Sequence, residues 1–343
     1  MTRVYDSFPA LIQAPMAGSQ GSALAIAVGQ SGGLGSLPCA MLGLDQLQAE
    51  LRLLTEAGLQ AYNINFFAHT TPQPNPAQEA AWLNCLKPYF DEWDLNVSQV
   101  VSGPGRQPFS AAQAEVLEAY KPAVVSFHFG LPSADLLRRV RALGAQVWST
   151  ATTVAEGLWL QKNGADVVIA QGLEAGGHRG HFLSPDLTEQ MGTLALLPQL
   201  VRMLDIPVIA AGGIATPQAV RAALELGASA VQVGSAYLLA NEATTSAVHR
   251  AALKSDARFH TALTNLFSGR PARGMVNRVM QELGFIRSEV PEFPLATAAM
   301  APLRVAAERA GLGDFSPLWV GQHLATTTEE PAAVITQRLL SGL

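Results

Sequence analysis

The sequence predicts an α/β fold: a TIM-like (β/α)8 barrel with an additional, mostly helical C-terminal region that forms a substrate site or lid. Eight short apolar runs recur along the chain, and helix-like segments rich in Ala and Leu separate them. Most of these runs are continuously apolar, which is typical of strands covered on both faces of a parallel sheet. Eight strand–helix units within roughly 250 residues favour a closed barrel over an open, doubly wound sheet.

The predicted strands each end in or near Gly, Ser, Asn or Pro. They are Leu11–Met16, Gly33–Pro38, Ala61–Phe67, Ala123–Phe129, Gln146–Ala151, Asp166–Gln171, Ile206–Gly212 and Ala230–Ser235. Capping signals mark the helices between them: Thr153 stands three residues before Glu156, and Thr216 precedes a proline at the first helical position. The clearest predicted helices are Asp45–Ala57, Ser133–Leu143, Thr153–Asn163 and Thr216–Leu226.

The periodic strand–helix unit stops near residue 245, and this predicts the division of the chain. We expect residues 1–245 to form the barrel, with an excursion at about 68–122 that is rich in Pro and Trp. We expect residues 246–343 to form the mostly helical region that covers the mouth of the barrel.

Composition excludes several classes of protein. Apolar residues make up 49% and charged residues 14% of the chain, against a usual charged share of about a quarter. The net charge is −5, so a basic nucleic-acid footprint is not expected. Gly and Pro interrupt the long uncharged stretch near the N-terminus, so a membrane span is not expected either. The two cysteines form no C-x-x-C pair. We therefore expect a soluble cytoplasmic protein.

The residues at the predicted strand ends narrow the chemistry, because barrel enzymes place their sites there. No lysine stands at a strand end, which argues against a Schiff-base aldolase. Among carboxylates only Glu174 is near one, so a carboxylate-bound Mg²⁺ site is poorly supplied. Glycines, amides, hydroxyls and two histidines remain. That set suits a neutral, hydrogen-bonding cofactor that carries a phosphate.

The last two strands predict the phosphate site. Gly212 and Gly213 follow the seventh strand, and Gly234 and Ser235 follow the eighth. Barrels often bind phosphate in these two loops, where glycine lets backbone N–H groups approach the anion. The Ser235 hydroxyl can add a hydrogen bond. Tight turns after buried strands are the alternative interpretation.

A second cluster follows the sixth strand. Gly176 and Gly177 allow backbone to lie flat against a planar ligand, and Gln171 can bond the polar edge of its ring. His178 then projects over the ligand as a base, and His128 converges from a neighbouring strand. A structural role for either histidine is the alternative. No metal is expected, because a glycine-rich loop fixes no helical face for ligands.

Five motifs together resemble the FMN-dependent nitronate monooxygenases over roughly residues 8–245, with a weaker extension to Phe315–Gln322. They are Ala14-Pro15-Met16-Ala17-Gly18, Asn63-Ile64-Asn65-Phe66-Phe67, Gln171-Gly172-x-Glu174-Ala175-Gly176-Gly177-His178, Ala211-Gly212-Gly213-Ile214 and Gly234-Ser235. The resemblance implies non-covalent FMN. The backbone of Ala14, Pro15 and Met16 would contact its ring system, and Asn65 and Gln171 would bond its polar edge or ribityl chain. Gly176 and Gly177 would flank the flavin. Gly212, Gly213, Gly234 and Ser235 would hold its phosphate, and His178 would be the base or anion stabiliser.

The implied reaction is the oxidation of an alkyl nitronate, such as propionate 3-nitronate, by O₂ to a carbonyl compound and nitrite. The alternative is an FMN-dependent NAD(P)H reductase of quinones or enoyl thioesters on the same barrel. A sugar-phosphate isomerase or epimerase would need paired acid and base groups, which the strand ends lack. A non-enzymatic binding module would leave a buried polar cluster unused.

One segment departs from the family pattern. The family's best-defined bacterial group has Tyr and Lys in the C-terminal segment that lines the substrate site. Here residues 293–303 offer only Thr297 as a polar side chain, so we expect an apolar pocket that favours a larger or less polar substrate. The sequence leaves the oligomeric state open, with a homodimer as one option.

Overall fold

Eight parallel strands form the centre of the molecule. The computed structural model describes residues 8–100, 106–324 and 328–343, so parts of the expected 1–245, 68–122 and 246–343 segments lie outside the described residues. The strands are β1 (Leu11–Gln13), β2 (Ser36–Pro38), β3 (Asn63–Phe67), β4 (Val124–His128), β5 (Gln146–Ala151), β6 (Val167–Gln171), β8 (Val208–Ala211) and β9 (Ala230–Val233). Each lies within or overlaps one of the eight predicted runs.

The sheet closes on itself. Its strand order is β1-β9-β8-β6-β5-β4-β3-β2. The two end strands meet where Ile12 bridges Leu34 in parallel, and the Gln13 N–H donates to the Leu34 carbonyl over 2.9 Å. Gly35 is required beside this closure, because a Cβ there would lie 2.0 Å from the carbonyl oxygen of Ala25. The prediction of a TIM-like barrel is therefore confirmed.

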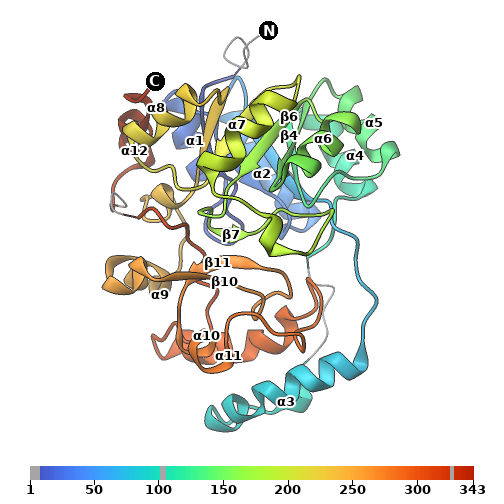
Figure 1. The fold of residues 1–343 in the computed structure, drawn as a ribbon, viewed down its shortest axis with the longest axis vertical. Coiled ribbons are helices and arrows are strands. Elements are labelled where there is room, and N and C mark those ends of the chain that lie inside the picture. The colour runs from blue at the N-terminus through green and yellow to red at the C-terminus, as the bar shows by residue number, and fades with distance from the viewer. Residues whose placement is uncertain (1–7, 101–105, 325–327) are drawn as a thin grey trace.

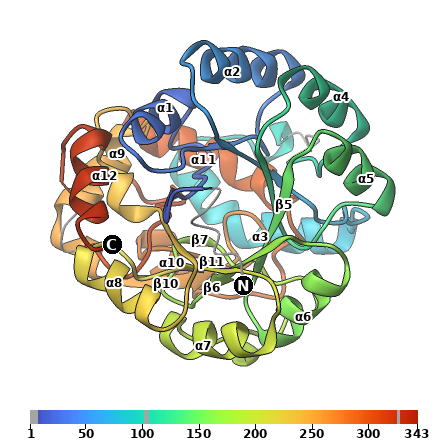
Figure 2. The same cartoon turned by 90° about the horizontal axis from the view of Figure 1, so that it is seen from above.

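Helices surround the strands, as the view from above shows (Figure 2). They are α1 (Ser22–Gln30), α2 (Leu44–Glu56), α4 (Ala111–Tyr120), α5 (Ala134–Ala142), α6 (Val154–Lys162), α7 (Thr193–Met203), α8 (Pro217–Glu225) and α12 (Ala332–Leu340). Both predicted helix caps are present in the structure. The Thr153 hydroxyl accepts from the Glu156 N–H, and the Thr216 hydroxyl accepts from the Ala219 N–H. Leucine, valine and alanine side chains of these helices pack on the outward strand residues and form two large apolar clusters around the barrel.

A second layer lies below the barrel in Figure 1. It contains α9 (Ala247–Lys254), β10 (Thr261–Thr264), β11 (Ala272–Met275), α10 (Arg278–Leu283) and α11 (Thr297–Arg309). The excursion after β3 adds α3 (Pro76–Glu92), which packs against α11, and Trp82 and Leu86 of α3 join the buried cluster of this layer. The short helical turns are η2 (Val97–Gln99), η3 (Leu187–Glu189), η4 (Ser235–Tyr237) and η5 (Asp256–Phe259). We call residues 246–324 of this layer the lid.

Two features of the C-terminal region differ from the prediction. The lid holds a small antiparallel sheet in the order β10-β11-β7, and β7 (Gly177–His178) comes from the loop after β6. The sequence showed no apolar run there, because β11 reads Ala-Arg-Gly-Met and pairs through its backbone. The last helix, α12, returns to the barrel and packs on α1 and α8, so it completes the helical ring. No helix among the described residues is long and apolar enough to cross a membrane.

Candidate active site

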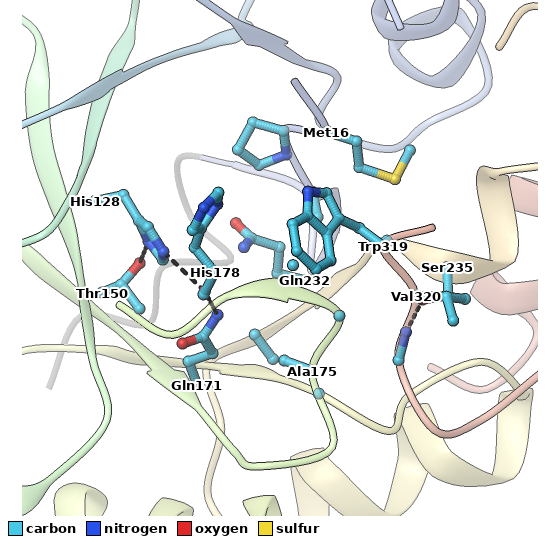
Figure 3. Close-up of a pocket in the computed structure, with 18 of the residues that line it drawn as sticks. Met16, His128, Thr150, Gln171, Ala175, His178, Gln232, Ser235, Trp319 and Val320 are labelled. Atoms are coloured by element: carbon cyan, nitrogen blue, oxygen red, sulfur yellow. Dashed lines mark hydrogen bonds between the residues drawn. The ribbon is translucent and has the colours of Figure 1, made fainter. Parts of the chain in front are cut away.

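One cavity opens at the carboxyl ends of the strands, between the barrel and the lid (Figure 3). Every residue that the sequence analysis put forward lines it: Ala14, Pro15, Met16, Asn65, His128, Gln171, Gly176, Gly177, His178, Gly212, Gly213, Gly234 and Ser235. The two histidines, whose relative position the sequence could not give, therefore face one space. The lid contributes Trp319, Val320, Gly321 and His323 to the same wall.

His178 is held on β7 by the lid. Its backbone pairs with Ala272 of β11, and its Nε2 lies 2.8 Å from the Ser268 hydroxyl. The imidazole packs against aromatic rings, 5.3 Å from Phe293 and 5.6 Å from Trp319 between centroids. Burial lowers the pKa of His178 well below its usual value, and the charge of Arg106 lowers it further. His178 is therefore neutral near pH 7.

His128 engages both ring nitrogens. Its Nε2 lies 3.1 Å from the carbonyl oxygen of His178, and its Nδ1 lies 3.0 Å from the Thr150 hydroxyl. A carbonyl oxygen only accepts, so Nε2 carries the proton and the neutral Nδ1 accepts from Thr150. Burial lowers the pKa of His128 to about 4. This geometry favours a role in positioning His178 over the catalytic role that the sequence analysis put forward.

Gln171 also holds the loop that carries His178. Its amide Nε2 donates to the His178 carbonyl oxygen over 2.9 Å, and its Oε1 accepts from the Gly180 N–H over 2.8 Å. Fully buried Arg179 ties the same loop down by donating to the carbonyl oxygens of Gly172 and Gln171. Gln171 thus lines the cavity, and both its amide nitrogen and its amide oxygen are hydrogen-bonded to the loop that carries His178.

The paired glycines have structural reasons of their own. A Cβ on Gly176 would lie 2.5 Å from the Gly321 nitrogen, so only glycine lets the loop after β6 approach the lid backbone. Gly177 has a φ of +71°, in the left-handed region that favours glycine. The sequence analysis ascribed both to contact with a planar ligand. In the structure Gly176 meets the lid backbone, and Gly177 begins strand β7 with a positive φ.

The glycine loops after β8 and β9 form the opposite end of the cavity. Ser235 opens η4, and its hydroxyl oxygen accepts from the Gly321 N–H over 2.8 Å, which leaves the hydroxyl proton free to donate. The lid residue His323 turns its Nδ1 toward the Gly213 carbonyl oxygen at 2.8 Å, so this nitrogen carries a proton. Gly213 has a φ of +71° and Gly212 a φ of +115°. This end offers the donors that an anion needs.

A buried polar atom in the cavity wall lacks a protein partner. Gln232 projects from β9 beside β1, and its Oε1 makes no hydrogen bond to any described residue. An unpaired buried amide oxygen is costly, and a polar ligand in the cavity would satisfy it. Asn65 lies across the barrel and donates to the Ser126 hydroxyl over 2.9 Å, which leaves its own carbonyl oxygen available at the wall. These amides and the glycine loops fit a flavin mononucleotide, which carries amide-like groups, hydroxyls and a phosphate.

Two partly buried cations, Arg106 and Arg270, give the site its charge. Arg106 lines the cavity, and Arg270 lies 4.1 Å from the ring centroid of Phe129. Burial lowers the pKa of Arg270 to about 10, which keeps it charged at neutral pH. Neither guanidinium makes an ion pair with a carboxylate among the described residues. With His178 neutral, positive potential in this space comes from arginine.

Sequence reasoning missed several of these residues. Arg106 belongs to the excursion, where no periodic pattern pointed to the barrel mouth, and Ser268 belongs to the unpredicted hairpin loop. The available signal for the lid wall was the weak extension of the motif resemblance to residues 315–322, which contains Trp319 and Gly321. The described residues contain no group of three His, Cys, Asp or Glu side chains placed to hold a metal ion.

Known proteins match this chain over its full length. A family model described as nitronate monooxygenase matches residues 1–342. The chain belongs to the nitronate monooxygenase family. A nitronate monooxygenase from Pseudomonas aeruginosa is 39% identical over 347 residues, covering 100% of this chain and 98% of that protein. One from Paraburkholderia phytofirmans is 37% identical, covering 96% of this chain and 90% of that protein.

Solved structures agree with this assignment to the nitronate monooxygenase family. A nitroalkane oxidase from Streptomyces ansochromogenes superposes with a TM-score of 0.90 at 35% identity, covering 100% of this chain and 98% of that one. FabK from Thermotoga maritima superposes with a TM-score of 0.70 at 26% identity, covering 100% and 96%. The resemblance drawn from five short motifs is thus confirmed, as is the prediction of an oxidoreductase.

Proposed function

We propose that this member of the nitronate monooxygenase family binds FMN in the cavity at the barrel mouth and oxidises alkyl nitronates with O₂ to a carbonyl compound and nitrite. The observation that carries the proposal is the composition of this cavity. Glycine loops and the Ser235 hydroxyl lie at one end, the unpaired amide oxygen of Gln232 lines the wall, and a neutral histidine and a partly buried arginine lie at the other end.

The phosphate of FMN would lie at the loops after β8 and β9. Backbone N–H groups around Gly212, Gly213 and Gly234 and the hydroxyl of Ser235 would hold it. His323 would border the phosphate from the lid, with its Nδ1 proton donated to the Gly213 carbonyl oxygen.

The ring system and ribityl chain would lie between β1 and β6. The backbone of Ala14, Pro15 and Met16 would contact the ring system, and the side chains of Asn65, Gln171 and Gln232 would meet its polar groups. Gly176 and Gly177 would border it from the loop after β6. When bound, FMN supplies an acceptor for electrons from the substrate and a donor of electrons to O₂.

His178 would act at the substrate end. A neutral imidazole can accept a proton, so it can deprotonate a nitroalkane to the nitronate. It cannot attract an anion through its own charge, and Arg106 would supply that attraction. The aromatic rings of Phe67, Phe293 and Trp319 pack around His178 at this end and would limit the access of water, which would strengthen electrostatic interactions there.

A cytoplasmic location goes with this proposal. Cys39 and Cys85 are both free in the structure, which is usual in a reducing compartment. The substrates are small molecules, and the acidic net charge gives no reason to expect nucleic acid.

The test is an anaerobic titration of the purified yellow protein. Propionate 3-nitronate should bleach the flavin absorbance, whereas NADH in a parallel cuvette should not. Heat-released flavin should be identified as FMN by mass spectrometry. If NADH bleaches the flavin and nitronate does nothing, the reductase alternative replaces the proposal. A colourless protein that takes up no FMN would overturn the cofactor assignment.

A further inference from the structure

A guanidinium stands at the substrate end of the cavity without a carboxylate partner. Arg106 leads from the excursion toward the lid, and its Nη1 donates to the Thr297 hydroxyl, at the start of α11, over 3.1 Å. Its Cζ lies 5.9 Å from the ring centroid of Phe293, so the side chain contacts both Phe293 and Thr297 of the lid. Among the described residues no carboxylate lies within ion-pair distance of it.

This guanidinium has donors to spare. Arginine carries five N–H groups in a planar fork. One of those of Arg106 is used in the hydrogen bond to the Thr297 hydroxyl. Partial burial lowers the pKa of Arg106, and the charge of Arg304 lowers it further, so this guanidinium is incompletely solvated and repelled by a second cation. A bound anion would relieve both effects, because a carboxylate matches the fork with two parallel hydrogen bonds.

Arg106 and His178 share one neighbour. The imidazole of His178 lies 5.3 Å from the ring centroid of Phe293, the ring that Arg106 also lies against, and the Arg106 charge lowers the pKa of His178. The apolar surface that Arg106 and His178 share is the Phe293 ring, which the imidazole of His69 also contacts, 4.9 Å between centroids. A ligand that spans this ring therefore has a short aliphatic chain, with its reacting group at His178 and an anionic group at Arg106.

We propose that Arg106 is a specificity-determining residue that binds a carboxylate on the substrate, so that the enzyme selects short nitronates that carry a carboxylate over simple alkyl nitronates. This inference rests on the proposed function. It also replaces the apolar substrate site expected from residues 293–303: the cation comes from the excursion, outside that segment, and Thr297 orients it.

The experiment compares two substrates of equal chain length in the holoenzyme, propionate 3-nitronate and propane-1-nitronate. Arg106→Gln should lower kcat/KM for propionate 3-nitronate by about 10- to 100-fold, the usual loss for a hydrogen-bonded charged group. Propane-1-nitronate should change by less than about threefold, since it lacks the carboxylate. Arg304→Gln is the matched control. It removes a nearby charge from α11 that is paired with Glu308, and both substrates should change little.

A binding assay separates this inference from the proposed function. Succinate and its uncharged diamide, succinamide, share one carbon chain and need no turnover, and each is titrated into the holoprotein while the flavin spectrum is followed. The wild type and Arg304→Gln should bind succinate more tightly, and Arg106→Gln should lose that preference. Arg106→Lys, which keeps the charge without the fork, should retain part of it. Equal loss for both ligands, or an unchanged preference, would overturn the role of Arg106. Failure of both nitronates to react in the wild type would instead overturn the proposed function, and the succinate result would still stand.

Discussion

The hydroxyl of Ser235 offers a direct test of the phosphate site. Its oxygen accepts from the Gly321 N–H over 2.8 Å, so its proton is free to point into the cavity beside the glycine loops. Ser235→Ala would remove a donor to the phosphate dianion and leave the Gly321 N–H without this acceptor. A hydrogen bond to a charged group is worth about 1.5–3 kcal/mol, which corresponds to a loss of roughly 10- to 150-fold in FMN affinity.

Riboflavin separates the two consequences of this substitution. It shares the ring system and ribityl chain with FMN but has no phosphate, so the loss at Gly321 affects both ligands and cancels in the ratio of their affinities. The apoprotein should be titrated with each flavin while the quenching of flavin fluorescence is followed. We expect the FMN-to-riboflavin affinity ratio to fall at least about tenfold in Ser235→Ala. An unchanged ratio would refute the placement of the phosphate at this loop.

Three further predictions follow from the buried groups. His178→Asn keeps the backbone contacts but removes the base, so turnover of a neutral nitroalkane should fall about 10²- to 10⁴-fold at unchanged FMN content. Turnover of the preformed nitronate should fall less, and equal losses for the two substrates in steady-state assays would argue against a base. Glu156→Gln should destabilise the fold by about 2–4 kcal/mol in urea unfolding, because the buried carboxylate accepts from the N–H groups of Thr152 and Phe182, whereas Glu118→Gln, in an exposed ion pair, should cost less than about 1 kcal/mol. Burial lowers the pKa to about 4 in His69, about 3 in His181 and about 4 in His249. As the pH falls, these histidines take up protons in the unfolded chain before they do so in the folded protein, so the free energy of unfolding should be full above pH 6.5 and fall by about 1 kcal/mol per pH unit for each histidine as the pH drops toward 4. Equal urea midpoints at pH 7.5 and 5.5 would contradict this.

The barrel could be predicted because its signals are local. A strand covered on both faces reads as a continuous apolar run, and a capped helix reads as a hydroxyl three residues before a carboxylate, as at Thr153 and Glu156. The lid sheet could not be predicted in this way. Its strands are short and its pairing partner, Gly177–His178, is two residues long, so backbone geometry over a distance of about a hundred residues decides it.

The same distinction between local and long-range signals applies to the residues of the site. Residues at the ends of regular strands could be placed from the sequence, because parallel strands bring their carboxyl ends to one face. The hydrogen-bond roles of those residues could not be placed. Gln171 and His128 were expected to face a ligand, yet each spends bonds on the carbonyl oxygen of His178. Arg106 was missed altogether, since its position depends on contacts with Phe293 and Thr297, far along the chain.

The lid is therefore part of the site and does more than cover it. His178 belongs to a strand that pairs with β11, Gly176 touches the backbone at Gly321, and Ser235 bonds the same residue from the other side. These contacts attach the loops after β6 and β9 to one lid segment, at opposite ends of the cavity. A movement of residues 319–321 would thus change the substrate end and the phosphate end together. This coupling explains why position 176 tolerates no side chain: the position is set by the packing of two protein backbones.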